Sequence, residues 1–323
     1  MAAINLLEIP EVPAQILQAA SRGKLVVFVG AGVSRIIGCP SWEKFALKYL
    51  DYIYDKKCIT FYEYENLKQY VPRKLLSICM NIIKEKRRLS GPDLRSIFEG
   101  EKEKINKFYI FEYLYNFNAI YVTTNYDEHL DLIAERNDKT TLKYKAETEV
   151  EEMKVPTLGN KVLYRKEDLL SSNLAIGKVL HLHGSIKDQR NMVVTIVDYI
   201  KNYEKDSIPA VLLEEIFSNY TVLFVGYGVE EYELLEFIVN KSATPERVVQ
   251  HFMLYPVFSA ERALNKFLKS YYRDLGIQLV HYSIGKQGYE QLANVIKEWA
   301  RKIGPISRPQ SFLERRKIIK EVI

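Results

Sequence analysis

The sequence predicts an α/β protein with a doubly wound, mostly parallel sheet, and three observations support this fold class. Six short runs rich in apolar and β-branched residues recur along the 323-residue chain, and a helical pattern follows each run. The runs are almost continuously apolar, which is typical of parallel strands that helices cover on both faces. Four of the runs end in small, polar or glycine-rich residues, as strands do where a ligand approaches the sheet. The six runs are Leu25–Val29, Ala119–Thr123, Val179–Leu182, Val222–Val225, His251–Val257 and Ile277–Tyr282.

Two insertions interrupt this expected Rossmann-like sheet. Residues 61–106 place apolar side chains at helical spacing, so we expect a helical insertion subdomain over about residues 55–117. Residues 137–178 are polar and poorly periodic, and we expect them to cross the mouth of the site or to form a lid. A helix over Tyr289–Ile303 is expected to break at Pro305 and Pro309. One domain is therefore expected over residues 1–305, followed by a charged helix or tail over residues 306–323.

Composition places the chain among ordinary globular proteins. Hydrophobic residues make up 47% and charged residues 27%, so a full core can be buried. No stretch approaches the roughly 18 consecutive apolar residues that cross a bilayer, and the N-terminus has no secretory pattern, so we expect a cytoplasmic protein without a membrane partner. The net charge of +5 is mild. The basic runs Lys84–Arg88 and Arg315–Lys317 are interpreted as solvated helix faces, so direct binding to nucleic acid is not expected.

The cysteines exclude one common metal site. Cys39, Cys58 and Cys79 are widely spaced and odd in number, which favours reduced thiols over a disulfide framework. They form no CxxC pair, so a four-cysteine zinc module is excluded and no metal is expected.

A glycine turn follows the first strand, in the order Gly30-Ala31-Gly32-Val33-Ser34. Glycines at a strand-to-helix turn let the backbone approach a pyrophosphate closely, and exposed N–H groups then bind the anion. The spacing is only part of the dinucleotide-binding fingerprint. A tight turn that needs glycine for backbone reasons explains it equally well.

The second strand ends in Thr123-Thr124-Asn125-Tyr126-Asp127. The amide of Asn125 offers an acceptor and donors, which suit a ribose hydroxyl or an ordered water. Asp127 is a candidate site residue, and capping of the helix that follows is nearly as good an explanation for it.

Histidine and glycine follow the third and fourth strands. His183 lies at a strand end before Gly184-Ser185, where an imidazole is well placed as a general base near neutral pH. His181 lies within the strand and is interpreted as a core histidine satisfied by hydrogen bonds, and His129, His251 and His281 are also interpreted as structural. Gly226-Tyr227-Gly228 either approaches an adenine or its ribose, or forms a tight turn.

In this order, each after a strand, the four motifs resemble those of the sirtuin (silent information regulator) family, over about residues 25–282. The resemblance implies an NAD-binding domain in which the glycine turn holds the pyrophosphate and Asn125 contacts the nicotinamide ribose or positions water. It also implies that Asp127 supports the site's hydrogen bonds and that His183 is the catalytic base. Ser185 and Gly226 would lie near the adenosine half. The implied NAD-binding residues are Gly30, Ala31, Gly32, Ser34, Thr124, Gly184, Ser185, Gly226 and Gly228.

Departures from the family pattern narrow the resemblance. Protein-deacylating sirtuins carry the zinc module excluded above and an arginine in a PDFR segment, whereas the comparable stretch here is 38–45, GCPSWEKF. This form looks like the sirtuin-like domains of bacterial anti-phage systems, which deplete NAD on infection. The resemblance thus implies an NAD⁺ glycohydrolase that releases nicotinamide and ADP-ribose without zinc. It also implies a partner such as a HerA-type ATPase or a fused or associated phage-sensing module, and the need to gate the activity leads us to expect a homo-oligomer.

Two other functions stay open at this point. One is NAD-dependent protein deacylation or ADP-ribosylation, against which the missing zinc module argues. The other is a sensor that binds NAD or ADP-ribose without turnover, against which the intact Asn125 and His183 argue. Because an ungated NAD hydrolase would poison its host, we expect oligomerisation or a partner to open the site through residues 137–178 or the tail 308–323.

Overall fold

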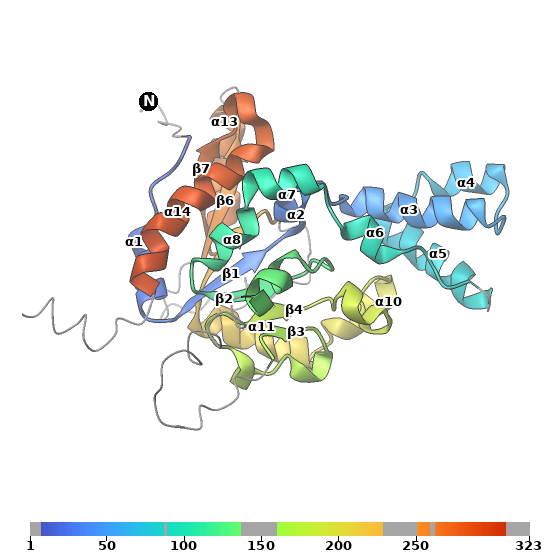
Figure 1. Ribbon diagram of the computed structural model, residues 1–323, viewed down its shortest axis with the longest axis horizontal. Helices are drawn as coiled ribbons and strands as arrows, with labels where there is room; N and C mark the ends of the chain where they lie inside the picture. Colours follow the sequence, from blue (N-terminus) through green and yellow to red (C-terminus); the bar gives the residue numbers. More distant parts are fainter. Residues whose placement is uncertain (1–7, 87–88, 137–159, 229–250, 259–261, 308–323) are drawn as a thin grey trace, which may run out of the picture.

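Seven parallel strands form one sheet in the part of the chain that the computed structural model describes (Figure 1). The described residues are 8–86, 89–136, 160–228, 251–258 and 262–307. The order across the sheet is β3-β4-β2-β1-β5-β6-β7, and every neighbouring pair is parallel. The strands are β1 (Leu25–Val29), β2 (Ile120–Thr123), β3 (Val162–Leu163), β4 (Val179–His181), β5 (Thr221–Val225), β6 (His251–Val257) and β7 (Ile277–Ser283). The expected doubly wound, Rossmann-like α/β fold is confirmed.

The chain reverses its direction across the sheet between β1 and β5. From β1 it proceeds to β2 and then β4 on one side, and β5, β6 and β7 follow on the other side. In doubly wound sheets, ligands bind outside the carboxyl ends of the strands at such a switch point. All five residues of β1 are buried, as expected for a central strand covered on both faces.

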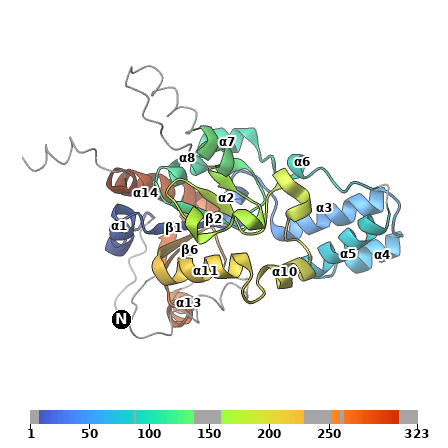
Figure 2. The same ribbon diagram turned by 90° about the horizontal axis from the view of Figure 1, so that it is seen from below.

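Helices cover both faces of the sheet (Figures 1 and 2). α1 (Ala14–Ser21), α8 (Ile110–Tyr115) and α14 (Gln291–Ser307) share a core with alternate residues of β1, β5 and β6. α11 (Ile208–Asn219) and α13 (Arg262–Asp274) border the second core, which includes Val26, Phe28 and Phe224 of the same strands.

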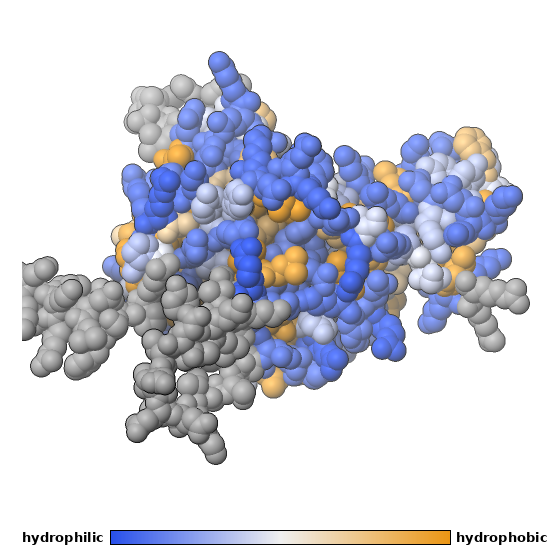
Figure 3. Space-filling model, viewed as in Figure 1, coloured by the Kyte–Doolittle hydropathy of each residue, from blue (hydrophilic) through white to orange (hydrophobic). Residues whose placement is uncertain are grey.

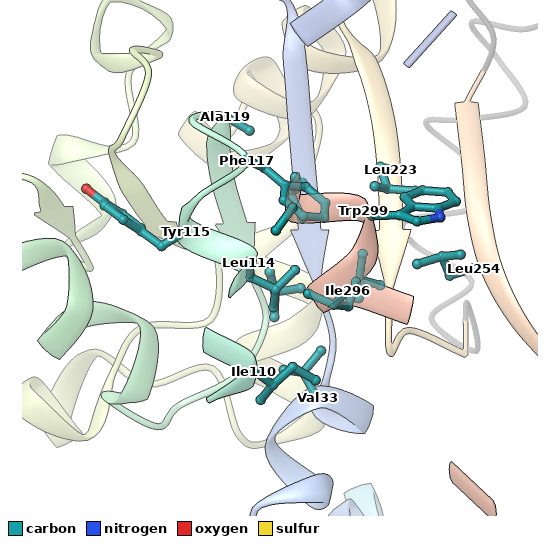
Figure 4. Close-up of a cluster of buried hydrophobic side chains, with 14 of the residues drawn as sticks. Val33, Ile110, Leu114, Tyr115, Phe117, Ala119, Leu223, Leu254, Ile296 and Trp299 are labelled. Carbon is teal, nitrogen blue, oxygen red and sulfur yellow. The ribbon is translucent and has the colours of Figure 1, made fainter. Parts of the chain in front are cut away.

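Figure 4 shows the first of these cores. The indole of Trp299 is fully buried near Leu223 and Leu254, and its N–H donates to the carbonyl of Pro10 at 2.8 Å. An aromatic ring of this kind buries roughly 200 Å², which is worth on the order of 5 kcal/mol. α14 thereby ties the N-terminal segment to the sheet.

Helices between β1 and β2 form an arm beside the sheet (Figure 1). The short α2 (Ala31–Ile36) follows β1, and the arm contains α3 (Trp42–Asp55), α4 (Phe61–Leu67), α5 (Pro72–Glu85) and α6 (Leu94–Phe98). α3 starts at a Ser41 cap and α4 at a capping box of Thr60 and Glu63. α7 (Lys102–Phe108) and α8 then return to the sheet. The helical insertion thus starts at Trp42, earlier than the expected boundary near residue 55.

The arm has its own apolar core, and that core reaches the sheet. Phe45, Leu50 and Leu76 pack in one cluster with Tyr126, from the loop after β2, and with Ile186 from the loop after β4. The arm is therefore in contact with two of the segments singled out in the sequence.

Two segments differ from the sequence-based expectation. Residues 160–178 include the edge strand β3 and the 3₁₀ turns η1 (Lys166–Asp168) and η2 (Ser171–Asn173), which contact α11, so this half of the expected lid extends the sheet. A two-residue strand leaves no periodic signal in the sequence. The rest of that segment, 137–159, lies outside the described residues, as do 308–323 of the expected tail.

The second difference is at Pro305, where the expected helix break does not occur. α14 continues to Ser307. Proline removes one backbone donor, and near a helix end this costs only a bond of the last turn.

The surface in Figure 3 is largely hydrophilic, with apolar residues in separate spots. Among the described helices, none has both the length and the apolar character to cross a bilayer. The remaining described elements are α10 (Ile196–Asn202), η3 (Ile186–Asn191) and η4 (Gly285–Glu290), with helical residues at 129–136.

Candidate active site

The four sequence motifs follow four adjacent strands of the sheet. The glycine turn of residues 30–34 follows β1, and residues 123–127 end β2 and form the loop after it. The loops after β4 and β5 carry His183 and Gly226, and the strand order β4-β2-β1-β5 makes these four neighbours. Since all the strands are parallel, their carboxyl ends meet at one edge. The structure thus brings together segments that are up to about 200 residues apart in the sequence.

Two glycine loops pack directly on each other at the switch point. The N–H of Gly30 donates to the carbonyl of Val225 at 2.9 Å, and the N–H of Gly32 donates to that of Gly226 at 2.8 Å. A Cβ on Gly32 would lie 2.6 Å from the Gly226 oxygen, and Gly226 itself has φ of +62°. Gly32 and Gly226 are thus needed so that the loops after β1 and β5 can approach each other closely. This backbone requirement is the second of the two explanations that the sequence allowed for the glycine turn. The exposed Ala31 lies at the same turn, and a pyrophosphate there stays a prediction.

Ser34, Asp127 and Asn125 form a hydrogen-bonded network behind the turn. The hydroxyl of Ser34 donates to Asp127 Oδ2 at 2.6 Å, and both side chains are buried. Its proton is therefore used, so the hydroxyl oxygen can only accept from Asn125 Nδ2, 3.1 Å away. This orients the amide of Asn125, with its N–H₂ group toward Ser34 and its oxygen turned away from that hydroxyl.

Asp127 also serves the helix that follows it. Its Oδ1 accepts from the N–H of His129 at 3.3 Å, at the start of the helical residues 129–136. The carboxylate of Asp127 therefore has both of the roles considered from the sequence. It caps the helix that follows, and it belongs to the hydrogen-bonded network of Ser34 and Asn125.

The main chain of Asn125 is held on both sides. Its N–H donates to Thr123 Oγ1 at 3.0 Å, and that hydroxyl donates to the carbonyl of Val29 in β1. The carbonyl of Asn125 lies 3.0 Å from Nδ1 of His181. Asn125 and its neighbour Thr124 are half-buried, so a polar side chain at a fixed position faces partly outward.

His183 is buried, and tyrosine hydroxyls lie at both of its ring nitrogens. The hydroxyl of Tyr203 is 2.7 Å from Nε2 and that of Tyr199 is 3.4 Å from Nδ1. Burial, together with the charge of Arg73, lowers the pKa of His183 to about 3. The imidazole is therefore neutral at physiological pH, and in this covered arrangement it is a weak base.

The helical arm reaches this histidine through α10. The guanidinium of Arg73, in α5, stacks over the Tyr199 ring at 3.9 Å, and the N–H of Ile196 donates to Ser77 Oγ at 3.0 Å. Because α10 and the residue after it supply both tyrosines, the covering of His183 is coupled to the position of α5.

The loop after β4 is attached to the loop after β2. Gly184 has φ of +75°, and a Cβ there would lie 2.7 Å from the Asn191 oxygen, so glycine is required. Ser185 is buried; its hydroxyl accepts from Lys187 N to cap η3 and contacts the carbonyl of Tyr126 at 3.4 Å. The two loops are thus hydrogen-bonded to each other. Contacts of Ser185, Gly226 and the more exposed Gly228 with adenosine stay predictions.

Three of the four histidines interpreted as structural have hydrogen-bond or stacking partners within the core, and the fourth, His281, lies against the ring of Tyr255. His181 is buried with both ring nitrogens bonded, which confirms it as a satisfied core residue. His129 stacks on Phe111, and His251 accepts from the N–H of Val222.

Sequence reasoning missed Tyr199, Tyr203 and Arg73 around His183, and Asp131 and Lys187 around His181. Tyr199 and Tyr203 are four residues apart, so helical spacing alone places them on one face. Nothing in the sequence indicates which residue that face covers.

Comparison with known proteins agrees with this geometry. A family model described as a SIR2-like domain matches residues 119–279, a region that contains the motifs after β2, β4 and β5. The chain is also 25% identical over 224 residues to Defense-associated sirtuin 2 of Bacillus subtilis. That alignment covers 68% of this chain but only 19% of the relative, so the chain spans a small part of that protein's length.

The described loops after β1, β2, β4 and β5 meet at one edge of a parallel sheet, and three of them lie within the matched region. Over residues 119–279 this chain therefore carries a SIR2-like domain, the domain of the sirtuin-like proteins.

Proposed function

We propose that the chain is an NAD⁺ glycohydrolase that cleaves the bond between nicotinamide and ribose. The observation that carries this proposal is the orientation of the Asn125 amide by Ser34 and Asp127, beside the loop that bears a neutral, buried His183. A dinucleotide at the switch point between β1 and β5 would bring its ribose to these side chains.

The reaction consumes water and NAD⁺ and releases nicotinamide, ADP-ribose and a proton. The C1′–N bond breaks and its electron pair goes to the pyridinium nitrogen, which leaves as neutral nicotinamide. A water oxygen bonds to C1′, and its proton passes to a base. The leaving group is cationic in the substrate, so departure leaves positive character on the ribose, and the task of the protein is to orient ribose and water.

Each central residue has one role in this proposal. The oxygen of the Asn125 amide, turned away from Ser34, accepts a hydrogen bond from the attacking water or a ribose hydroxyl. Asp127 holds Ser34, and His183 accepts the proton once the tyrosines over it have moved, because exposure to water raises its pKa toward the ordinary value. The Gly30 turn with Ala31 would contact the pyrophosphate.

Substrate access requires a change around His183. Tyr203 occupies the hydrogen-bonding direction at Nε2 that a ribose hydroxyl or water would need. We therefore infer that movement of α10, to which the arm is attached through Arg73 and Ser77, precedes turnover. Oligomerisation or a partner, such as a HerA-type ATPase or a phage-sensing module, would supply this movement.

The relative named as a defence-associated sirtuin supports a role in defence. We propose that NAD depletion by this chain contributes to abortive infection in anti-phage defence. In this proposal a partner protein or phage-sensing module supplies the trigger for NAD depletion.

The decisive experiment measures nicotinamide released from NAD⁺ by the full chain, without any acyl-lysine peptide. We expect release by the wild type and loss of at least about 100-fold in Asn125→Ala and His183→Ala. His281→Gln, a histidine change on β7 at the far end of the sheet, is the matched control and should retain activity.

Three outcomes contradict the proposal in different ways. Release only with an acylated peptide would indicate a deacylase, and transfer of ADP-ribose to protein would indicate a transferase. NAD binding without release, with or without candidate partners, would indicate a sensor. In cells, NAD should fall after phage infection with the wild type and not with His183→Ala.

A further inference from the structure

A buried histidine–carboxylate pair lies next to the main chain of Asn125. His181, at the end of β4, places Nε2 2.7 Å from Oδ1 of Asp131, in the helical residues 129–136. Lys187 Nζ lies 3.2 Å from the other Asp131 oxygen and 2.8 Å from Glu135. The side chains of His181 and Asp131 are 1% and 0% exposed, so water does not solvate this pair.

The partners of His181 determine its protonation. Nε2 faces a carboxylate oxygen, and Nδ1 faces the carbonyl oxygen of Asn125 at 3.0 Å. Both partners are acceptors only, while a neutral imidazole carries a single N–H. Only the imidazolium donates to both, so the hydrogen-bond pattern assigns a positive charge to His181.

Electrostatics agrees with this assignment. Burial acts to lower the pKa of His181, but the adjacent Asp131 outweighs burial and the pKa is raised above the ordinary value. Burial likewise acts to raise the pKa of Asp131, and His181 and Lys187 reverse this, so the pKa is lowered. Both shifts favour the ionised pair, in agreement with the hydrogen-bond pattern.

We propose that His181 and Asp131 are positioning residues for cleavage of the nicotinamide–ribose bond, because the imidazolium held by Asp131 fixes the main chain of Asn125. This inference rests on the proposed function. The N–H of Asn125 is held by Thr123 and its amide by Ser34, so His181 supplies the third constraint on the same residue.

Stability alone is a poor explanation for such a pair. A buried ion pair replaced as a whole by neutral residues of similar volume is often neutral or stabilising, because the cost of removing both charges from water disappears. The pair also connects β4 to the helix after β2, but an apolar contact would do the same. What an apolar contact cannot do is donate to the carbonyl of Asn125.

The test is the double variant His181→Leu/Asp131→Asn, which removes both charges together and changes volume little. Lys187 keeps Glu135 as its partner. We expect kcat for nicotinamide release to fall about 10- to 100-fold, with KM for NAD⁺ within about two-fold of the wild type. His251→Leu, the same change at another buried histidine on a strand, is the control and should leave kcat within about two-fold of wild type. A folded double variant with wild-type kcat overturns the inference.

A second readout does not depend on activity. In ¹⁵N spectra of the wild type, both ring nitrogens of His181 should be protonated from pH 6 to 8. The side-chain amide resonance of Asn125, assigned with Asn125→Ala, should shift in the double variant and not in His251→Leu. A neutral His181, or an Asn125 resonance that is unchanged in the double variant, refutes the inference. Absence of nicotinamide release by the wild type would instead refute the proposed function, and the spectra would still test the positioning role.

Discussion

Replacing Ser34 by alanine tests the network that orients Asn125. The change removes a buried, charge-assisted hydrogen bond to Asp127 of 2.6 Å and a neutral one from Asn125 of 3.1 Å. Bonds of these two kinds contribute about 1.5–3 and about 0.5–1.5 kcal/mol. Ser34→Ala should therefore lower the free energy of unfolding by about 2–4 kcal/mol. It should also lower kcat, because the Asn125 amide is then free to rotate.

A double-mutant cycle separates the network from general damage to the core. Ser34→Ala, Asp127→Ala and the double variant are compared by urea unfolding and by nicotinamide release. Ser34→Ala leaves Oδ2 of Asp127 without its hydroxyl donor, and Asp127→Ala removes that oxygen. The double variant should therefore be more stable than the sum of the single effects predicts, by about 1.5–3 kcal/mol. Its kcat should be close to that of the worse single variant.

Additivity would refute this reasoning. If the two effects on unfolding sum within about 0.5 kcal/mol, Ser34 and Asp127 do not act as a unit. A Ser34→Ala variant with wild-type kcat would show that the amide of Asn125 needs no orientation by this hydroxyl.

Three further changes have defined outcomes. Gly226→Ala should destabilise the fold by about 2–5 kcal/mol in urea unfolding, because an L-residue at positive φ costs about 1–2 kcal/mol and a Cβ 2.5 Å from Val33 N adds overpacking. Tyr203→Phe should raise kcat/KM for NAD⁺ about 2- to 10-fold, because one neutral hydrogen bond to His183 no longer has to break before substrate reaches Nε2. The third change concerns His183, whose pKa is about 3 in the folded protein and near 6.5 in the unfolded chain. As pH drops from 6.5 toward 3, the unfolded chain binds a proton at this histidine and the folded protein does not. The free energy of unfolding therefore falls over this pH range. His183→Gln should reduce this slope, measured by urea unfolding at several pH values, by up to about 1.4 kcal/mol per pH unit.

Each of these predictions has a contrary result. Wild-type stability of Gly226→Ala would mean that the loops after β1 and β5 are not in close contact. A fall in kcat/KM in Tyr203→Phe would make Tyr203 a participant in the reaction instead of a cover. An unchanged pH slope in His183→Gln would mean that this imidazole is not held neutral by burial.

Local sequence pattern was sufficient for most of the sheet. Six of the seven described strands coincide with continuous apolar runs, since a strand buried on both faces has few alternatives to Val, Ile, Leu and Phe. The edge strand β3 was missed because two residues paired on one side leave no such pattern.

The sequence by itself also determined which segments gather near the candidate site, because parallel strands bring their carboxyl ends to one edge wherever their loops lie in the chain. It separated His183 from His181, which the structure places in the loop after β4 and at the last residue of β4. Only the tertiary structure decided what surrounds them. The tyrosines at His183 come from α10, and the carboxylate at His181 comes from the helix after β2. The charge on His181, the neutrality of His183 and the direction of the Asn125 amide depend on burial and on partners distant in sequence, which no local pattern encodes.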